Sequence, residues 1–71
     1  MIKATQIHIH RAESRHTEYD EMTVVIADLH LYATISDDRQ IRLAKRLADE
    51  HGAAFVVSEP LKARVKQALG E

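Results

Sequence analysis

Apolar and polar residues alternate at the beginning of the chain. Between residues 2 and 11, Thr5, Ile7 and Ile9 fall on one side of an extended segment, and Gln6, His8 and His10 fall on the other. A period of two residues is typical of a β-strand with one buried face. The pattern therefore predicts a strand over residues 2–11, with its isoleucines directed toward the core.

A second and longer alternation runs through residues 22–35. From residue 25 onward its odd positions are all apolar and form one continuous apolar face: Val25, Ala27, Leu29, Leu31, Ala33 and Ile35. Its even positions are apolar at the start and polar toward the end: Met22, Val24, Ile26, Asp28, His30, Tyr32 and Thr34. We expect one long strand with a bend or bulge, because strands of this length are uncommon without one.

The segment that joins these two strands, residues 11–21, is polar and charged. It contains neither Gly nor Pro, the residues that usually form tight hairpin turns. The sequence therefore predicts a long hairpin loop over 11–21 rather than a two-residue turn.

The second half of the chain follows a helical pattern that is broken once. A helix is expected over residues 37–51, because Asp37 and Gln40 form a capping-box pattern and Gly52 stands where a left-handed residue ends a helix. Its apolar stripe is Ile41, Ala44, Leu47 and Ala48, widened by Leu43.

The pattern of residues 53–58 predicts a strand that is apolar on both faces, which suits an interior strand or one buried by a partner. Pro60 predicts the first turn of a second helix, with a stripe of Leu61, Val65, Ala68 and Leu69.

These elements predict one small α+β domain over residues 1–71. The fold class is a two-layer sandwich in the order β-β-α-β-α, with a three-stranded mixed sheet and the helices packed mainly on one face. The final strand should run parallel to the second and antiparallel to the first, beside the second or inserted beside the first. We expect the first helix to cover the odd-numbered face of the long strand.

Composition narrows the ways in which such a domain can be stabilised. The 71 residues include no cysteine, which excludes disulfides, cysteine–zinc sites and thiol chemistry. A domain of this size has a small core, so oligomerisation is a common remedy. The net charge of −1 favours neither nucleic acid nor membrane as a partner. The chain lacks an apolar run long enough to cross a membrane and an N-terminal signal-peptide pattern, which predicts a cytoplasmic location.

An uncovered sheet face is the first candidate functional surface. If helices cover one face, the other would carry the even positions of the long strand, where Val24 and Ile26 form an apolar patch. A twofold homodimer would bury that patch. The dimer-interface candidates are Val24, Ile26, Tyr32, His8 and His10.

The histidines of the same predicted face offer a different chemistry. His8, His10, His30 and Asp28 could supply nitrogen and oxygen ligands to zinc or another transition metal, if the hairpin register brings them together. Other interpretations are a solvated or interface face in which histidine is filler, or a pH-sensitive interface. No cofactor is expected. We also expect no enzyme, because the polar groups around His16 and Tyr19 have no pocket in which to converge.

Basic residues on the two helices form the last candidate surface. They are Arg39, Arg42, Lys45, Arg46, Lys62 and Lys66, and they suit an acidic protein partner or the phosphates of nucleic acid. The function expected from the sequence is a non-enzymatic protein–protein interaction module that acts by occupying a surface and forms a homodimer. Adaptors, regulators and inhibitors are of this class, and it includes the small inhibitors carried by phages and mobile elements. The first alternative is nucleic-acid binding through the basic helix face, and the second is histidine-based metal binding.

Overall fold

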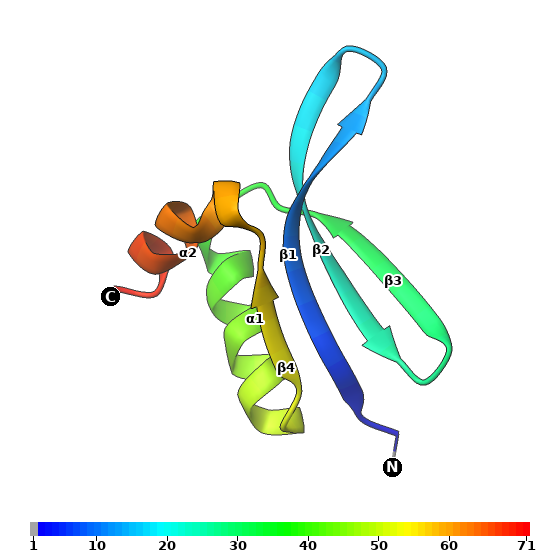
Figure 1. The fold of residues 1–71 in the computed structure, drawn as a ribbon. Helices are drawn as coiled ribbons and strands as arrows, with labels where there is room; N and C mark the ends of the chain where they lie inside the picture. The colour runs from blue at the N-terminus through cyan, green and yellow to red at the C-terminus, as the bar shows by residue number, and fades with distance from the viewer. Residues whose placement is uncertain (1) are drawn as a thin grey trace.

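Residues 2–71 fold into one four-stranded sheet with two helices (Figure 1). The structure is a computed structural model, and it describes residues 2–71. The strands are β1 (Ala4–Ser14), β2 (Thr17–Ile26), β3 (Leu29–Thr34) and β4 (Ala54–Val57). The helices are α1 (Asp38–His51) and α2 (Lys62–Ala68), the latter preceded by a 3₁₀ turn, η1 (Glu59–Leu61). The α+β class is confirmed, but the order is β-β-β-α-β-α, and the prediction of three strands is wrong.

The segment predicted as a long loop is instead the continuation of two paired strands. β1 and β2 are antiparallel from Ala4↔Ile26 to Ser14↔Thr17, so Arg15 and His16 alone form the turn. Arg15 takes a left-handed backbone conformation with φ of 54°, which glycine usually provides in such turns. The distal half of this hairpin, the arm (residues 11–20), pairs with no third strand of residues 2–71 and projects from the sheet in Figure 1.

The segment predicted as one long strand is a second hairpin. Ala27 has a φ of 53°, and the chain reverses at Ala27 and Asp28 so that Ile26 pairs with Leu29. This reversal inverts the direction of the later strand relative to the direction that the sequence predicts. The last strand, β4, therefore pairs with β1 in parallel, giving the sheet order β3-β2-β1-β4. Of the two positions that the sequence leaves open for this strand, the structure has the one beside the first strand, whereas the predicted antiparallel direction relative to that strand is wrong.

The first helix agrees with its prediction at both ends. The Asp37 side chain accepts a hydrogen bond from the Arg39 amide, and the Gln40 side chain completes the capping box. Gly52 ends the helix with a φ of 65°. The second helix also forms after Pro60, with Leu61, Val65 and Ala68 buried. The strand between the helices lies at the edge of the sheet, so the interior position considered for it is wrong.

The core lies between β1 and the two helices. Ile7 and Ile9 of β1 are buried with residues of both helices, namely Ile41, Ala44, Ala48, Leu61, Val65 and Ala68. The helices thus lie on the same side of the sheet, called here the helix side (Figure 1). The opposite side, which carries His8 and His10, is called the open side.

Candidate interaction surfaces

Half of the helix side of the sheet is left uncovered. An α-helix with its side chains is about 10–12 Å wide, and strands lie about 4.8 Å apart, so one helix covers roughly two strands. Helix α1 packs mainly on β1 and β4. The short α2 contacts α1 and η1 instead. Strands β2 and β3 therefore have little cover from the helices of residues 2–71.

Four apolar side chains of β2 and β3 form what we call the apolar strip: Val24, Ile26, Leu29 and Leu31. Val24 packs against the border of the core, and the strip continues from it onto the uncovered half. Val24 pairs with Ile7 and with Leu31, and Ile26 pairs with Leu29. Directly paired residues point to the same side of a sheet, so all four share the helix side with buried Ile7. Leu29 is 62% exposed and Leu31 is 51% exposed. Such a patch is typical of an interaction site.

The structure separates the predicted dimer-interface residues into two groups. His8, His10 and Tyr32 do share a side, because His8 pairs with Thr23 and Thr23 pairs with Tyr32. Val24 and Ile26 lie on the other side, so placing them with the histidines is wrong. The expectation that α1 covers the odd positions of the long strand is also wrong, since Leu29 and Leu31 are exposed. Both errors follow from the unrecognised hairpin register.

On the open side, hydrogen bonds hold the two histidines of β1. The His8 Nε2 atom lies 3.2 Å from the Ser58 hydroxyl. The His10 Nε2 atom lies 2.8 Å from the Thr23 hydroxyl and 3.3 Å from the Glu21 carboxylate. The two imidazole rings are 4.9 Å apart between centroids. The histidines are therefore parts of a polar network across β2, β1 and the end of β4.

The four predicted metal ligands do not converge. His30 pairs with Val25, in a different row from the row of His8, and Asp28 lies in the β2–β3 turn. Within residues 2–71, no group of three or more histidine, aspartate or glutamate side chains is placed to hold a metal ion. The geometry therefore does not support the proposed ligand set.

Partial burial lowers the pKa of His8, and the neighbouring His10 lowers it further. Folded His8 thus binds its proton less tightly than unfolded His8, whose pKa is 6.5. The contribution of this group to stability is fully present above pH 6.5 and is lost as the pH falls below it.

We expect the melting temperature to fall as the pH is lowered from about 7.5 to about 5, and to fall less in His8→Gln, as measured by circular dichroism. The control is His30→Gln, an exposed histidine of the same side. An equal fall in wild type and His8→Gln would contradict the assignment.

The basic residues predicted as one surface divide between two hollows. Arg39, Arg42 and Arg46 line a shallow hollow on the outer face of α1, together with exposed Leu43. Lys45, Lys62 and Lys66 line a separate groove between α1, α2 and β4. Nucleic-acid binding favours basic residues clustered on one face, and the three arginines of α1 form one such cluster. Nucleic-acid binding stays a prediction.

A carboxylate–arginine cluster anchors the arm to the second helix. The Asp20 carboxylate lies 3.2 Å from the Arg11 Nε atom, and it also pairs with Arg64 of α2. Its side chain is only 13% exposed. The Asp20 carbonyl oxygen accepts a hydrogen bond of 2.8 Å from the amide of Ile35, at the end of β3. One residue of the arm therefore connects three elements.

Two surfaces were not foreseen from the sequence. The sequence places Leu29 and Leu31 beneath the first helix, and it places Phe55 and Val57 on a strand that is either interior to the sheet or buried by a partner. The alternation in residues 22–35 would have indicated the apolar strip if the break at Ala27 had been recognised. The groove beside β4 has no local signal, because three distant segments build it.

Neither helix within residues 2–71 is long and apolar enough to cross a membrane. Comparisons of the chain with protein-family models, with curated proteins and with solved structures find no match. The residues and their geometry are thus the basis for assigning a function.

Proposed function

We propose that this protein is a non-enzymatic protein-interaction module that forms a homodimer through the apolar strip. The observation that supports the proposal is the uncovered half of the helix side, where exposed Leu29 and Leu31 continue the half-buried Val24 and Ile26. Removing such side chains from water is favourable by about 25 cal/mol per Å². The gain matters for a 71-residue domain, whose own core is small.

The charge distribution favours a second copy of the chain as the occupant of the strip. Between positions 22 and 33, the residues of β2 and β3 that point to the helix side are all apolar: Met22, Val24, Ile26, Leu29, Leu31 and Ala33. Two such strips can face one another about a twofold axis without like-charge repulsion. The groove beside β4 could not do so, because its lysines would oppose their own copies.

Dimerisation through the strip leaves the other surfaces available to an outside partner. The open side, the arm and the groove beside β4 all lie away from the four residues of the strip. An adaptor, regulator or inhibitor that works by surface occupation needs this division between a self-contact and a partner contact. The dimer is thus the scaffold of the proposed function.

Sedimentation velocity tests the dimer directly. We expect wild type to sediment as a dimer and Leu31→Asp to sediment as a monomer, because a buried, unpaired carboxylate is costly at an interface. Leu31 is half exposed in the single chain, so this variant should keep its fold. Ile26→Asp should give the same result.

The matched control is Leu43→Asp, which places the same charge on an exposed leucine of α1. It should remain dimeric. The melting temperature of wild type, but not of Leu31→Asp, should also rise with protein concentration. A wild type that sediments as a monomer at every concentration would refute the proposal, as would dissociation by Leu43→Asp alone.

A further inference from the structure

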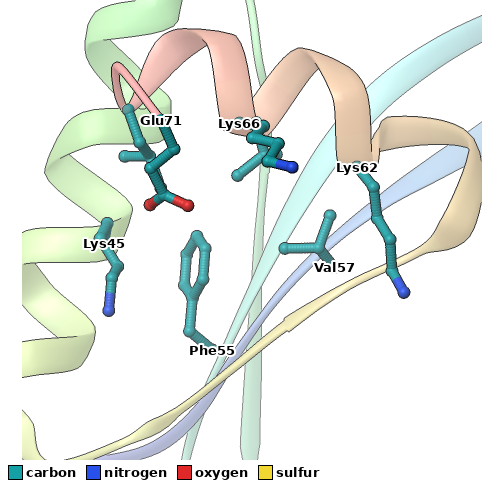
Figure 2. A pocket seen from close by; sticks show the side chains of 8 residues that line it. Lys45, Phe55, Val57, Lys62, Lys66 and Glu71 are labelled. Carbon is teal, nitrogen blue, oxygen red and sulfur yellow. The ribbon is translucent and has the colours of Figure 1, made fainter.

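A groove of about 370 Å³ lies beside β4, at the edge of the sheet opposite to β3 (Figure 2). Its apolar lining comes from Phe55 and Val57 of β4, from Val65 of α2, and from Leu69, which directly follows α2. Phe55 and Val57 are half-buried rather than buried. The groove therefore offers an apolar floor of about the size of one or two large side chains.

Positive charge surrounds this floor. Lys45 reaches over the Phe55 ring, with its ammonium 5.6 Å from the ring centroid. Lys62 and Lys66 line the groove from α2. Among residues 2–71, Lys45 also pairs with Asp49 at 2.8 Å and Lys62 with Glu59 at 3.0 Å, and no ion pair is formed by Lys66. Figure 2 shows the Glu71 carboxylate directed toward the Phe55 ring, so one acidic group of the chain itself lies beside the lysines of this groove.

The backbone of β4 provides a third feature. The Ser58 amide donates a hydrogen bond to the Ile9 carbonyl oxygen of β1. Because backbone groups of successive strand residues point to opposite edges, Val56 also faces β1, whereas Phe55 and Val57 direct their N–H and C=O groups outward. No strand within residues 2–71 pairs with that edge. The same two residues thus present side chains to the groove and hydrogen-bonding groups to the edge.

We propose that this groove binds an extended acidic peptide segment of a partner protein, which adds as a fifth strand beside β4. Strand addition gives main-chain hydrogen bonds, and alternate side chains enter the adjacent pockets. One groove-facing residue should be apolar, to reach Phe55 and Val57. The groove-facing residues two positions away on either side should be acidic, to reach the lysines. This contact goes beyond dimerisation and uses the other edge of the sheet, so it can be tested in Leu31→Asp as well as in wild type.

The probe is a fluorescein-labelled heptapeptide, Thr-Glu-Thr-Leu-Thr-Glu-Thr, whose binding is measured by fluorescence anisotropy. As a strand, it places its leucine and both glutamates on one face. The isomer Thr-Thr-Glu-Leu-Glu-Thr-Thr has the same composition, but it directs the glutamates to the face opposite the leucine. We expect saturable binding of the first peptide, and binding roughly tenfold weaker for the isomer. A peptide with lysine in place of glutamate should bind still more weakly.

Two charge-reversal variants locate the site. Lys62→Glu with Lys66→Glu should weaken binding of the first peptide by roughly tenfold or more. Arg42→Glu with Arg46→Glu, an equal change on the outer face of α1, should have little effect. All four residues are exposed, and melting curves confirm that each variant folds.

Three outcomes would overturn the proposal. The first is the absence of saturable binding by the peptides. The second is equal binding of the two isomers, which would show attraction of acid without strand addition. The third is a labelled single-stranded oligonucleotide that binds more tightly than the first peptide and is weakened by the same lysine variants, which would identify the groove as a phosphate site. Failure in any of these ways leaves the dimer proposal intact, because the dimer is tested by sedimentation.

Discussion

Replacing Ile41 by alanine is expected to lower the free energy of unfolding by roughly 2–5 kcal/mol. The Ile41 side chain is fully buried, at 0% exposure, in the cluster that joins α1 to Ile7 and Ile9 of β1. Its truncation removes apolar contacts and leaves a cavity that the neighbours fill only in part. Small domains are stabilised by only about 0.05–0.15 kcal/mol per residue, so this loss should be a large part of the total.

The same helix provides the control for this substitution. Leu43 is 59% exposed, although the sequence places it beside the apolar stripe. Leu43→Ala should change the unfolding free energy by less than about 0.5 kcal/mol. Urea denaturation at one protein concentration measures both variants. Similar losses at the two positions would mean that α1 packs through a different face.

Replacing Asp20 by asparagine is expected to cost about 1–3 kcal/mol, the usual loss when a hydrogen bond to a charged group is removed. Asparagine keeps the shape of the side chain but removes the charge shared by Arg11 and Arg64. The two guanidinium groups then keep only longer contacts, with Glu18 at 4.0 Å and with Asp38 at 3.7 Å. The loss should appear in denaturant unfolding and should be smaller at high salt, because ions screen the interaction that is lost.

The matched variant is Glu18→Gln, two residues earlier on the same strand. Its side chain is 60% exposed, and its carboxylate lies as far as 4.0 Å from Arg11. The change should therefore cost less than about 1 kcal/mol. Hydrogen exchange should show faster opening of the arm in Asp20→Asn than in Glu18→Gln. Equal stability of the two variants would mean that Asp20 does not anchor the arm to α2.

The first helix could be located from the sequence because its signals are local. Asp37, Gln40 and Gly52 act on backbone groups within one helical turn of their own positions. The apolar stripe then identifies the buried face, apart from Leu43. No tertiary information is needed for either step.

The two hairpin turns could not be predicted because each has an unusual residue at its left-handed position. Arg15 and Ala27 adopt left-handed backbone conformations without being Gly, Asn or Asp. Their strain is compensated by the pairing of the strands on either side, which the sequence shows only as continuous alternation. The single missed reversal at Ala27 explains the wrong strand count and the wrong direction of β4.

Some residues of the candidate surfaces could be placed from the sequence and others could not. His8, His10 and Tyr32 share one side as expected, because alternation within β1 and β3 is enough to place them. Val24 and Ile26 were assigned to that side wrongly, since their position depends on the register of a turn. The groove of Phe55 and Val57 depends on how α2 returns to β4, and no short stretch of sequence determines that.

The sheet order has a consequence for how the chain reaches its native state. The three strands β1, β2 and β3 follow one another through two-residue turns, so their pairing closes only short loops. The partner of β1 on its other side is β4, which lies near the opposite end of the chain. Loop-closure entropy increases with the length of the intervening chain, and non-local contacts of this kind slow folding. We therefore expect β1, β2 and β3 to pair early and β4 to add later. During synthesis, β1 should be transiently exposed as an edge strand.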